Sequence, residues 1–138
     1  MGSFWSTDSS GPGNNFEALL IFRENFLKNS AVDIQISNEV LWNHFTTDIF
    51  IYIHQIISEA VTNALRHAQA EHIEIGIRKT DAAVIVFIEN DGKPLPPEFD
   101  EGMGLPLMRY RASKIGAKLS ISRCENNNTR VECTLPAG

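Results

Sequence analysis

This chain of 138 residues is poor in cysteine, in positive charge and in long apolar runs. Its two cysteines, Cys124 and Cys133, lie outside any CxxC or Cys/His cluster, so they indicate neither a zinc site nor a disulfide framework. We interpret them as two small buried strand residues of a reduced protein. A formal net charge of −5 argues against a general binder of nucleic acid or anionic membranes, so no nucleic-acid partner is expected.

No apolar run approaches the roughly 18 residues that a membrane helix needs, and there is no secretory signal pattern. The sequence therefore predicts a cytoplasmic domain, and it leaves open a membrane anchor elsewhere in a longer protein. The hydrophobic content of 43% and the charged content of 21% are typical of a globular domain with a real core.

The first 15 residues are rich in glycine and serine and have no periodicity. We interpret residues 1–15 as a flexible tail or one that comes from an expression vector. Residues 16–138 are enough for one domain and too few for two.

Apolar periodicity divides this domain into helices and strands. The expected elements are a helix at 16–29, a strand at 31–40, a long helix at 46–68, strands at 72–78 and 83–90, a loop at 92–104, a helix at 105–115 that Gly116 ends, and strands at 118–123 and 129–135. This order predicts an α+β fold, a two-layer α/β sandwich with helices on one face of a mixed sheet.

The long helix carries Glu59, Asn63 and His67 at intervals of four residues. Successive members of this set are only about 40° apart around the helix, so they form one polar stripe at the margin of the apolar face. Such a stripe is commonly a solvated edge with side-chain pairing. It also suits phosphate chemistry, because an asparagine oxygen can bind Mg²⁺, a glutamate can orient its waters, and His67 with Arg66 can contact phosphate oxygens.

Two glycines, Gly102 and Gly104, precede the helix that begins at Leu105. Glycines let backbone amides approach an anion closely, and a helix N-terminus favours negative charge. The same glycines also occur in ordinary turns, so by themselves they are weak evidence for an anion site. Their position after the helix that carries the polar stripe strengthens the hypothesis.

Three segments, in this order along the chain, resemble the motifs of one protein family. The helix HQIISEAVTNALRHAQA is similar to the N box of the ATP-binding domain of bacterial sensor histidine kinases, NDG resembles their first glycine box, and GMGLPLMRYRA their second. The resemblance covers roughly residues 16–136 and implies the Bergerat fold shared by gyrase, heat-shock-chaperone, histidine-kinase and mismatch-repair ATPases. The kinases of the nitrate-sensor type are the most similar branch.

The resemblance implies a role for each matching residue. Asn63 would bind the Mg²⁺ that bridges the ATP phosphates, and Glu59 would be the catalytic carboxylate that positions water or assists transfer. The remaining expected ATP contacts are Arg66 and His67 along the phosphates, Gly102, Gly104 and Leu105 at the lid, and Asn90, Gly92 and Thr129 around adenine.

The chain departs from the family at the first glycine box, where Asn90 stands in place of the usual aspartate and Pro94 in place of the second glycine. Strand alternation places Asn90 on the same face as Val86 and Ile88, whereas Asp91 lies on the opposite face. Asn90 can still accept a hydrogen bond from the adenine amino group through its carbonyl oxygen, at a loss of roughly five- to tenfold in affinity.

The implied activity is transfer of the ATP γ-phosphoryl group to a histidine of a separate dimerisation domain in two-component signalling. No histidine here has the H-[DE] context of a phosphoacceptor, so the chain is expected to be the catalytic domain alone, with any homodimer made through the dimerisation domain. A LuxR-like response regulator is the expected downstream partner. The alternatives are an anti-sigma-type serine kinase and an interaction module of the same fold with impaired nucleotide binding.

Overall fold

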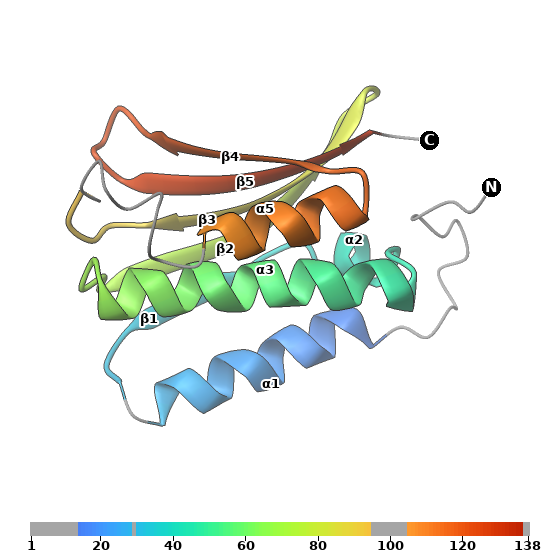
Figure 1. The fold of residues 1–138 in the computed structure, drawn as a ribbon. Helices are drawn as coiled ribbons and strands as arrows, with labels where there is room; N and C mark the ends of the chain where they lie inside the picture. The colour runs from blue at the N-terminus through green and yellow to red at the C-terminus, as the bar shows by residue number, and fades with distance from the viewer. Residues whose placement is uncertain (1–13, 29, 95–104, 137–138) are drawn as a thin grey trace.

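A computed structural model of the chain describes residues 14–28, 30–94 and 105–136. Its five strands form one sheet in the order β1-β2-β3-β5-β4 (Figure 1), in which β1 runs parallel to β2 and all other neighbours are antiparallel. The strands are β1 (Asp33–Ile36), β2 (His72–Lys79), β3 (Ala83–Asn90), β4 (Lys118–Arg123) and β5 (Thr129–Pro136).

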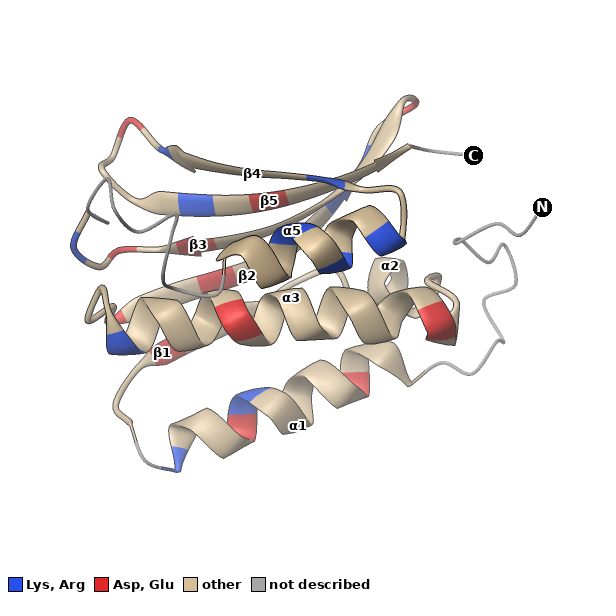
Figure 2. Ribbon diagram, in the orientation of Figure 1, with Lys and Arg blue, Asp and Glu red and all other residues tan. Residues whose placement is uncertain are grey.

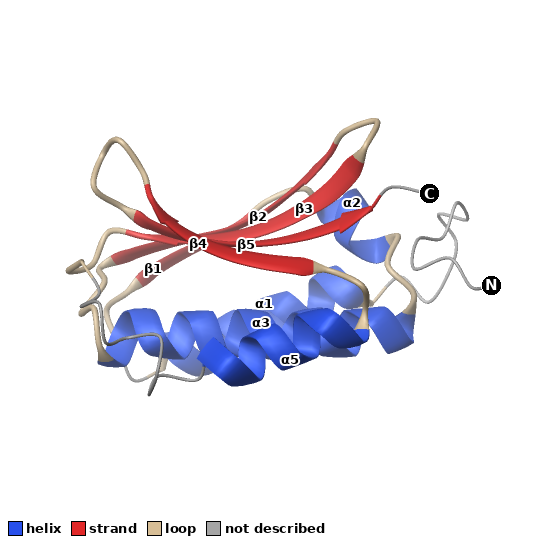
Figure 3. Cartoon of the chain, turned by 45° about the horizontal axis from the view of Figure 1, so that its top comes forward, coloured by secondary structure: helices blue, strands red, loops and turns tan. Residues whose placement is uncertain are grey.

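The helices form the second layer. They are α1 (Asn15–Leu27), α2 (Glu39–Asn43), α3 (Thr47–Arg66) and α5 (Leu105–Lys114). Figure 3 shows α1, α3 and α5 together beneath one face of the sheet. The predicted two-layer sandwich with helices on one face of a mixed sheet is therefore confirmed. Within the described residues, no helix is both long and apolar enough to cross a bilayer.

The core lies between α3 and the sheet. The buried residues of α3 recur at three and four, so one helical stripe faces inward. On β3 the inward set is Val84, Val86 and Ile88, none more than 1% exposed. Asn90 continues this set at the end of the strand and is 6% exposed. The alternation of β3 therefore directs a polar side chain toward the helix layer, as predicted.

Two boundaries differ from the sequence prediction. The strand expected at 31–40 is limited to β1, because Asn38 adopts a left-handed conformation with φ of 64° and turns the chain into α2. The Nδ2 of Asn38 donates to the carbonyl of Ile77 at 2.8 Å, which ties this turn to β2. The helix α2 was not anticipated, since five residues are too few for a periodic signal.

The helix α1 begins at Asn15, one residue inside the predicted tail, and residues 1–13 lie outside the described part of the chain. At the other end, Gly116 follows α5 with φ of 69°, in agreement with the predicted glycine stop. Cys133 is buried on β5 as expected, whereas Cys124 lies in the turn after β4 and is only partly buried.

Asn15 joins α1 to α2 and to the segment between α2 and α3. Its side chain is buried, and Nδ2 donates to the carbonyls of Trp42 and Phe45 at 2.8 and 2.9 Å. Asn15→Ala leaves both acceptors without this donor and is expected to lower the free energy of unfolding by about 1 to 3 kcal/mol in chemical denaturation. Asn25→Ala, at an exposed position of α1, is the control and should change it by less than about 0.5 kcal/mol. Equal effects of the two variants would contradict this role of Asn15.

Candidate functional site

Helix α3 and strands β3 and β5 meet at a pocket that contains polar residues from three distant parts of the chain. Its lining comprises Ala60, Asn63 and Ala64 of α3, Asn90 of β3, Met108 of α5, and Thr129 and Val131 of β5. Asn63, Asn90 and Thr129 are 7%, 6% and 5% exposed, and Asn15 is the fourth buried polar residue in the described part of the chain. Buried polar groups are normally rare and need partners, so three at one pocket mark a candidate site.

The pocket is narrow, with a volume of about 10 Å³, which is near the minimum for one water molecule. A purine base is much larger than this, so its entry requires the lining to move. Met108 is 1% exposed and comes from α5, which packs against α3. Methionine is unbranched and readily changes rotamer, so Met108 is the lining side chain best suited to move aside for a base.

The amide of Asn90 bonds to its own loop. Its Oδ1 accepts a hydrogen bond from the backbone N–H of Gly92 at 2.8 Å. One lone pair of the oxygen that was expected to face a base is therefore already engaged within the chain.

Asp91 points to the other side of the strand, as the alternation predicted. Its Oδ1 accepts from the backbone N–H groups of Glu71 and His72, both at 2.9 Å, and its Oδ2 lies 2.7 Å from Nδ1 of His72. Desolvation raises the pKa of Asp91, but the hydrogen bonds from His72 and Glu71 outweigh it and the pKa is lowered. Asp91 therefore anchors the start of β2 and takes no part in the pocket.

Gly92 lies against the end of α3. A Cβ at this position would be 2.5 Å from the carbonyl oxygen of Ala68 and 2.7 Å from its Cβ. The next residue, Lys93, donates its N–H to the same carbonyl at 2.7 Å. Sequence reasoning assigned the need for glycine to an approach to adenine, whereas the close neighbour in the structure is Ala68.

The other predicted residues lie around the pocket or outside it. Glu59 is half-buried on α3 one turn before Asn63, and Arg66, the last residue of α3, is exposed. His67 is also exposed and follows the helix with φ of −108°, so the expected polar stripe is regular only as far as Asn63. Leu105 is fully buried at the start of α5 and packs in the core.

Gly102 and Gly104 fall outside the described residues. Sequence reasoning missed the apolar walls of the pocket, which are Ala60, Ala64, Met108 and Val131. The small residues Ala60 and Ala64, four positions apart beside Asn63, were a usable signal, because they leave room next to the helix.

Helix α5 lies beside the pocket, and all of its charged residues are basic (Figure 2). It carries Arg109, Arg111 and Lys114 and has no acidic residue. None of these three forms an ion pair with a carboxylate in the described ranges of the chain. The helix therefore adds positive charge near the pocket in a chain whose net charge is negative.

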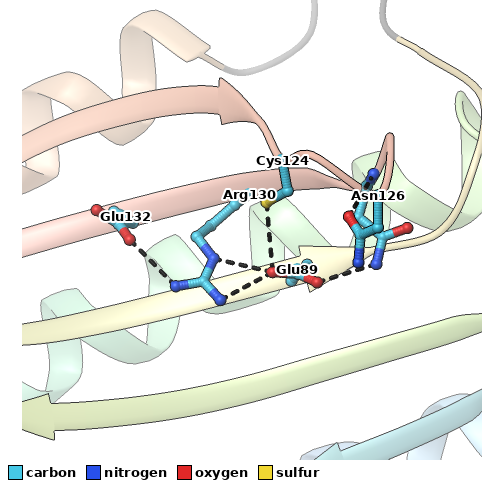
Figure 4. Close-up of polar contacts among 6 residues, drawn as sticks. Glu89, Cys124, Asn126, Arg130 and Glu132 are labelled. Carbon is cyan, nitrogen blue, oxygen red and sulfur yellow. Dashed lines mark hydrogen bonds and ion pairs between the residues drawn. The ribbon is translucent and has the colours of Figure 1, made fainter.

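The opposite face of the sheet carries a separate polar network centred on Glu89 (Figure 4). Glu89 accepts hydrogen bonds from Arg130 at 2.9 Å, Asn128 at 2.9 Å and Cys124 at 3.5 Å. Desolvation raises the pKa of Glu89, but the hydrogen bonds from Asn128 and Arg130 outweigh it and lower the pKa. These contacts join β3 to β5 and its turn, and they lie on the side away from the pocket.

Comparison with known proteins assigns the family. Residues 49–138 match the family of histidine kinase-, DNA gyrase B-, and HSP90-like ATPases, and the chain belongs to this family. The predicted relation to sensor histidine kinases is thereby confirmed.

Curated relatives are sensor kinases. The chain is 38% identical over 89 residues to the sensor protein NarQ homolog of Haemophilus influenzae, an alignment that covers 62% of this chain and 16% of that protein. It is 34% identical over 87 residues to the signal transduction histidine-protein kinase/phosphatase UhpB of Salmonella typhimurium, covering 62% and 17%. The chain thus spans less than a fifth of the length of these two relatives.

Solved structures agree on the fold. The histidine kinase domain of the blue-light activated histidine kinase of Erythrobacter litoralis EL346 superposes with a TM-score of 0.73 at 21% identity, covering 98% of this chain and 65% of that one. The catalytic domain of histidine kinase ThkA superposes with a TM-score of 0.69 at 23% identity, covering 89% and 90%. The chain therefore shares the fold of these two domains.

The contact of Gly92 with Ala68 predicts how each glycine tolerates substitution. Gly92→Ala should lower the free energy of unfolding by about 1 to 3 kcal/mol, because the added Cβ meets backbone atoms. At Gly116 the space is open and only the positive φ resists a side chain, so Gly116→Asn should be milder than Gly116→Ala. At Gly92, asparagine should be no milder than alanine. Chemical denaturation of the four variants tests this pattern, and a milder asparagine at Gly92 would contradict it.

The pair of His72 and Asp91 predicts a pH dependence of stability. The hydrogen bond to Asp91 is the main cause that raises the pKa of His72 above its ordinary value of 6.5. A raised pKa means that the pair stabilises the fold fully below pH 6.5, and that this contribution is lost as the pH rises through the raised value. The lowered pKa of Asp91 preserves its own contribution until the pH falls below the ordinary value of 3.8.

His72→Gln should therefore lower the melting temperature most between about pH 4 and pH 6.5, and less at higher pH. Thermal unfolding of both proteins across this range measures the difference. His44→Gln, which alters a histidine far from Asp91 in sequence, reports the general effect of losing an imidazole. A difference between wild type and His72→Gln that grows above pH 7 would rule out the pair as its source.

Proposed function

We propose that this chain binds Mg·ATP in the pocket formed by α3, β3, β5 and α5, and that it transfers the γ-phosphoryl group to a histidine of a separate dimerisation domain. The observation that carries the proposal is the meeting of Asn63, Asn90 and Thr129 at one buried pocket. Asn63 lies in the segment that resembles the N box and Asn90 in the one that resembles the first glycine box, and Thr129 is the position that the resemblance assigns to adenine.

Asn63 is the residue that would hold Mg²⁺. No group of three His, Cys, Asp or Glu side chains suited to a metal exists among the described residues. Mg²⁺ fits this donor set, because it usually keeps several waters and takes further oxygen ligands from the phosphates of its substrate. The bound ion would neutralise charge on the phosphates. Glu59, half-buried one turn earlier on α3, would accept a proton or orient a water next to Asn63.

Arg66 and His67 at the exposed end of α3 supply donors on the solvent side of Asn63. The basic residues of α5, which form no ion pair with a carboxylate among the described residues, add positive charge near the pocket. Gly102 and Gly104 would offer backbone amides to the phosphates, and Leu105, buried at the start of α5, would support this segment from the core. Phosphoryl transfer depends mainly on positioning and charge stabilisation, and this distribution of groups would supply both.

In the proposed reaction, the bond between the γ-phosphorus and its bridging oxygen breaks and ADP leaves. A nitrogen–phosphorus bond forms on the acceptor histidine of a separate dimerisation domain. Relatives named as sensor proteins and signal transduction kinases support a role in two-component signalling. The phosphoryl group would then pass to a response regulator of the LuxR-like type, and a longer protein would carry any membrane anchor.

The narrow pocket favours one alternative, a module of the same fold that binds a partner protein and no nucleotide. The two functions differ in a simple measurement, since a ligand that binds only the folded state must raise its melting temperature. A melting temperature that ignores millimolar Mg·ATP, with no heat of binding in calorimetry, would support the module and overturn the nucleotide site.

Asn63→Ala should weaken Mg·ATP binding by about tenfold or more and remove its dependence on Mg²⁺, because the protein loses its metal-binding oxygen. Calorimetric titrations with ATP in the presence of Mg²⁺ or of a chelator measure both effects. Asn25→Ala on the exposed face of α1 is the control and should bind as the wild type does. An Asn63→Ala protein that is folded and still binds ATP more tightly with Mg²⁺ than without would contradict the role of Asn63.

A further inference from the structure

The two strands that line the pocket carry a second cross-strand pair one residue away from it. Asn90, the last residue of β3, lies opposite Thr129, the first residue of β5. The neighbouring pair in the register is Glu89 with Arg130. Side chains alternate between the two faces of a sheet, so the first pair lines the pocket and the second lies on the opposite face. Any contact of Glu89 therefore acts on backbone that adjoins the pocket.

An ion pair joins β3 to β5 at this point. Oε1 of Glu89 accepts a hydrogen bond from Nε of Arg130 at 2.9 Å and lies 2.8 Å from its Nη2. The side chains of Glu89 and Arg130 are 14% and 22% exposed, and the guanidinium carbon lies 4.2 Å from the centroid of the Phe87 ring. A charge pair with two such contacts and a stacked guanidinium is held in one geometry more firmly than an exposed pair.

The same carboxylate also holds the turn that leads into β5 (Figure 4). Its Oε2 accepts from Nδ2 of Asn128 at 2.9 Å, and its Oε1 accepts from Sγ of Cys124 at 3.5 Å. The backbone N–H of Cys124 donates in turn to the carbonyl of Asn128 at 2.8 Å. Asn128 and Arg130 are the two residues that flank Thr129 in sequence. Glu89 thus bonds to the residue on each side of Thr129.

These contacts matter because the pocket residues lie at strand ends. Asn90 and Thr129 form the terminal pair of the ladder between β3 and β5. A terminal pair has no further pair beyond it, so the ends of elements open more easily than their centres. Glu89, which directly precedes Asn90, opposes this opening at the place where a binding site needs a fixed geometry.

We propose that Glu89 is a positioning residue of the base subsite, and that it holds Asn90 and Thr129 in place from the opposite face of the sheet. This role rests on the nucleotide site proposed above and adds to it a residue that does not touch the nucleotide. Small displacements of binding groups cost large factors, so loss of the carboxylate is expected to weaken binding of Mg·ATP by about fivefold or more.

The test compares Glu89→Ala with Glu132→Ala. Glu132 also bonds to Arg130, at 3.3 Å, and it lies on the same face of the sheet as Glu89. In the register, however, Glu132 lies opposite Phe87, farther from the pocket. Each variant removes one carboxylate from the same guanidinium and changes the net charge equally, so the second is a matched control.

Calorimetry measures the dissociation constant of Mg·ATP for the wild type and both variants. Glu89→Ala should bind about fivefold or more weakly than the wild type. Glu132→Ala should remain within about twofold of it. If Glu89→Ala is not folded in thermal melts, Glu89→Gln and Glu132→Gln replace the two variants, because glutamine keeps one oxygen but loses the charge and the second oxygen. The same factors then apply.

A second background separates positioning from a general loss of structure. Thr129→Ala removes a side chain that Glu89 is proposed to hold. Adding Glu89→Ala to Thr129→Ala should therefore weaken binding by a smaller factor than adding it to the wild type, because the two changes act through one group. A general disturbance of the fold would give the same factor in both backgrounds.

Three results overturn the proposal. They are a loss smaller than about fivefold in folded Glu89→Ala, an equal loss in Glu132→Ala, and an equal factor for Glu89→Ala in the Thr129→Ala background. All three leave the nucleotide site intact, since the wild type binds Mg·ATP in each of them. A wild type that does not bind Mg·ATP overturns the site and the role of Glu89 together.

Discussion

The contact between the end of β3 and the end of α3 is the constraint on which the site depends. The carbonyl of Ala68 accepts the N–H of Lys93, and Gly92 lies against the same residue with no space for a Cβ. This junction holds the last residue of β3 close to the last turns of α3. Asn90 and Asn63 therefore line one pocket although they are far apart in sequence.

Each of the three residues of the NDG segment makes a contact with a different part of the fold. Asn90 faces the helix layer and bonds to Gly92, Asp91 faces the opposite side and anchors the start of β2, and Gly92 permits the junction with Ala68. A tight turn alone needs fewer hydrogen bonds than this. The segment joins two strands and a helix, and it also presents a polar atom to the pocket.

Buried polar side chains line the pocket, and cationic side chains lie near it. Asn63, Asn90 and Thr129 are buried, whereas Arg66, Arg109 and Lys114 are exposed. The basic residues of α5 form no ion pair with a carboxylate among the described residues. A nucleotide has the same division, with a flat base that can be buried and phosphates that require positive charge. The distribution therefore fits the ATPase family to which the chain belongs.

The sequence by itself determined the longer helices and the strands of the sheet, the α+β class and the side of β3 on which Asn90 lies, but not the short helix α2. These features follow from local periodicity, since side chains alternate along a strand and recur at three and four along a helix. Only the tertiary structure decided that Gly92 meets Ala68, that Met108 walls the pocket and that the oxygen of Asn90 is engaged by Gly92. These contacts join residues that are distant in sequence, or they depend on the orientation of one amide. A local sequence pattern predicts neither the distant partner nor the amide orientation.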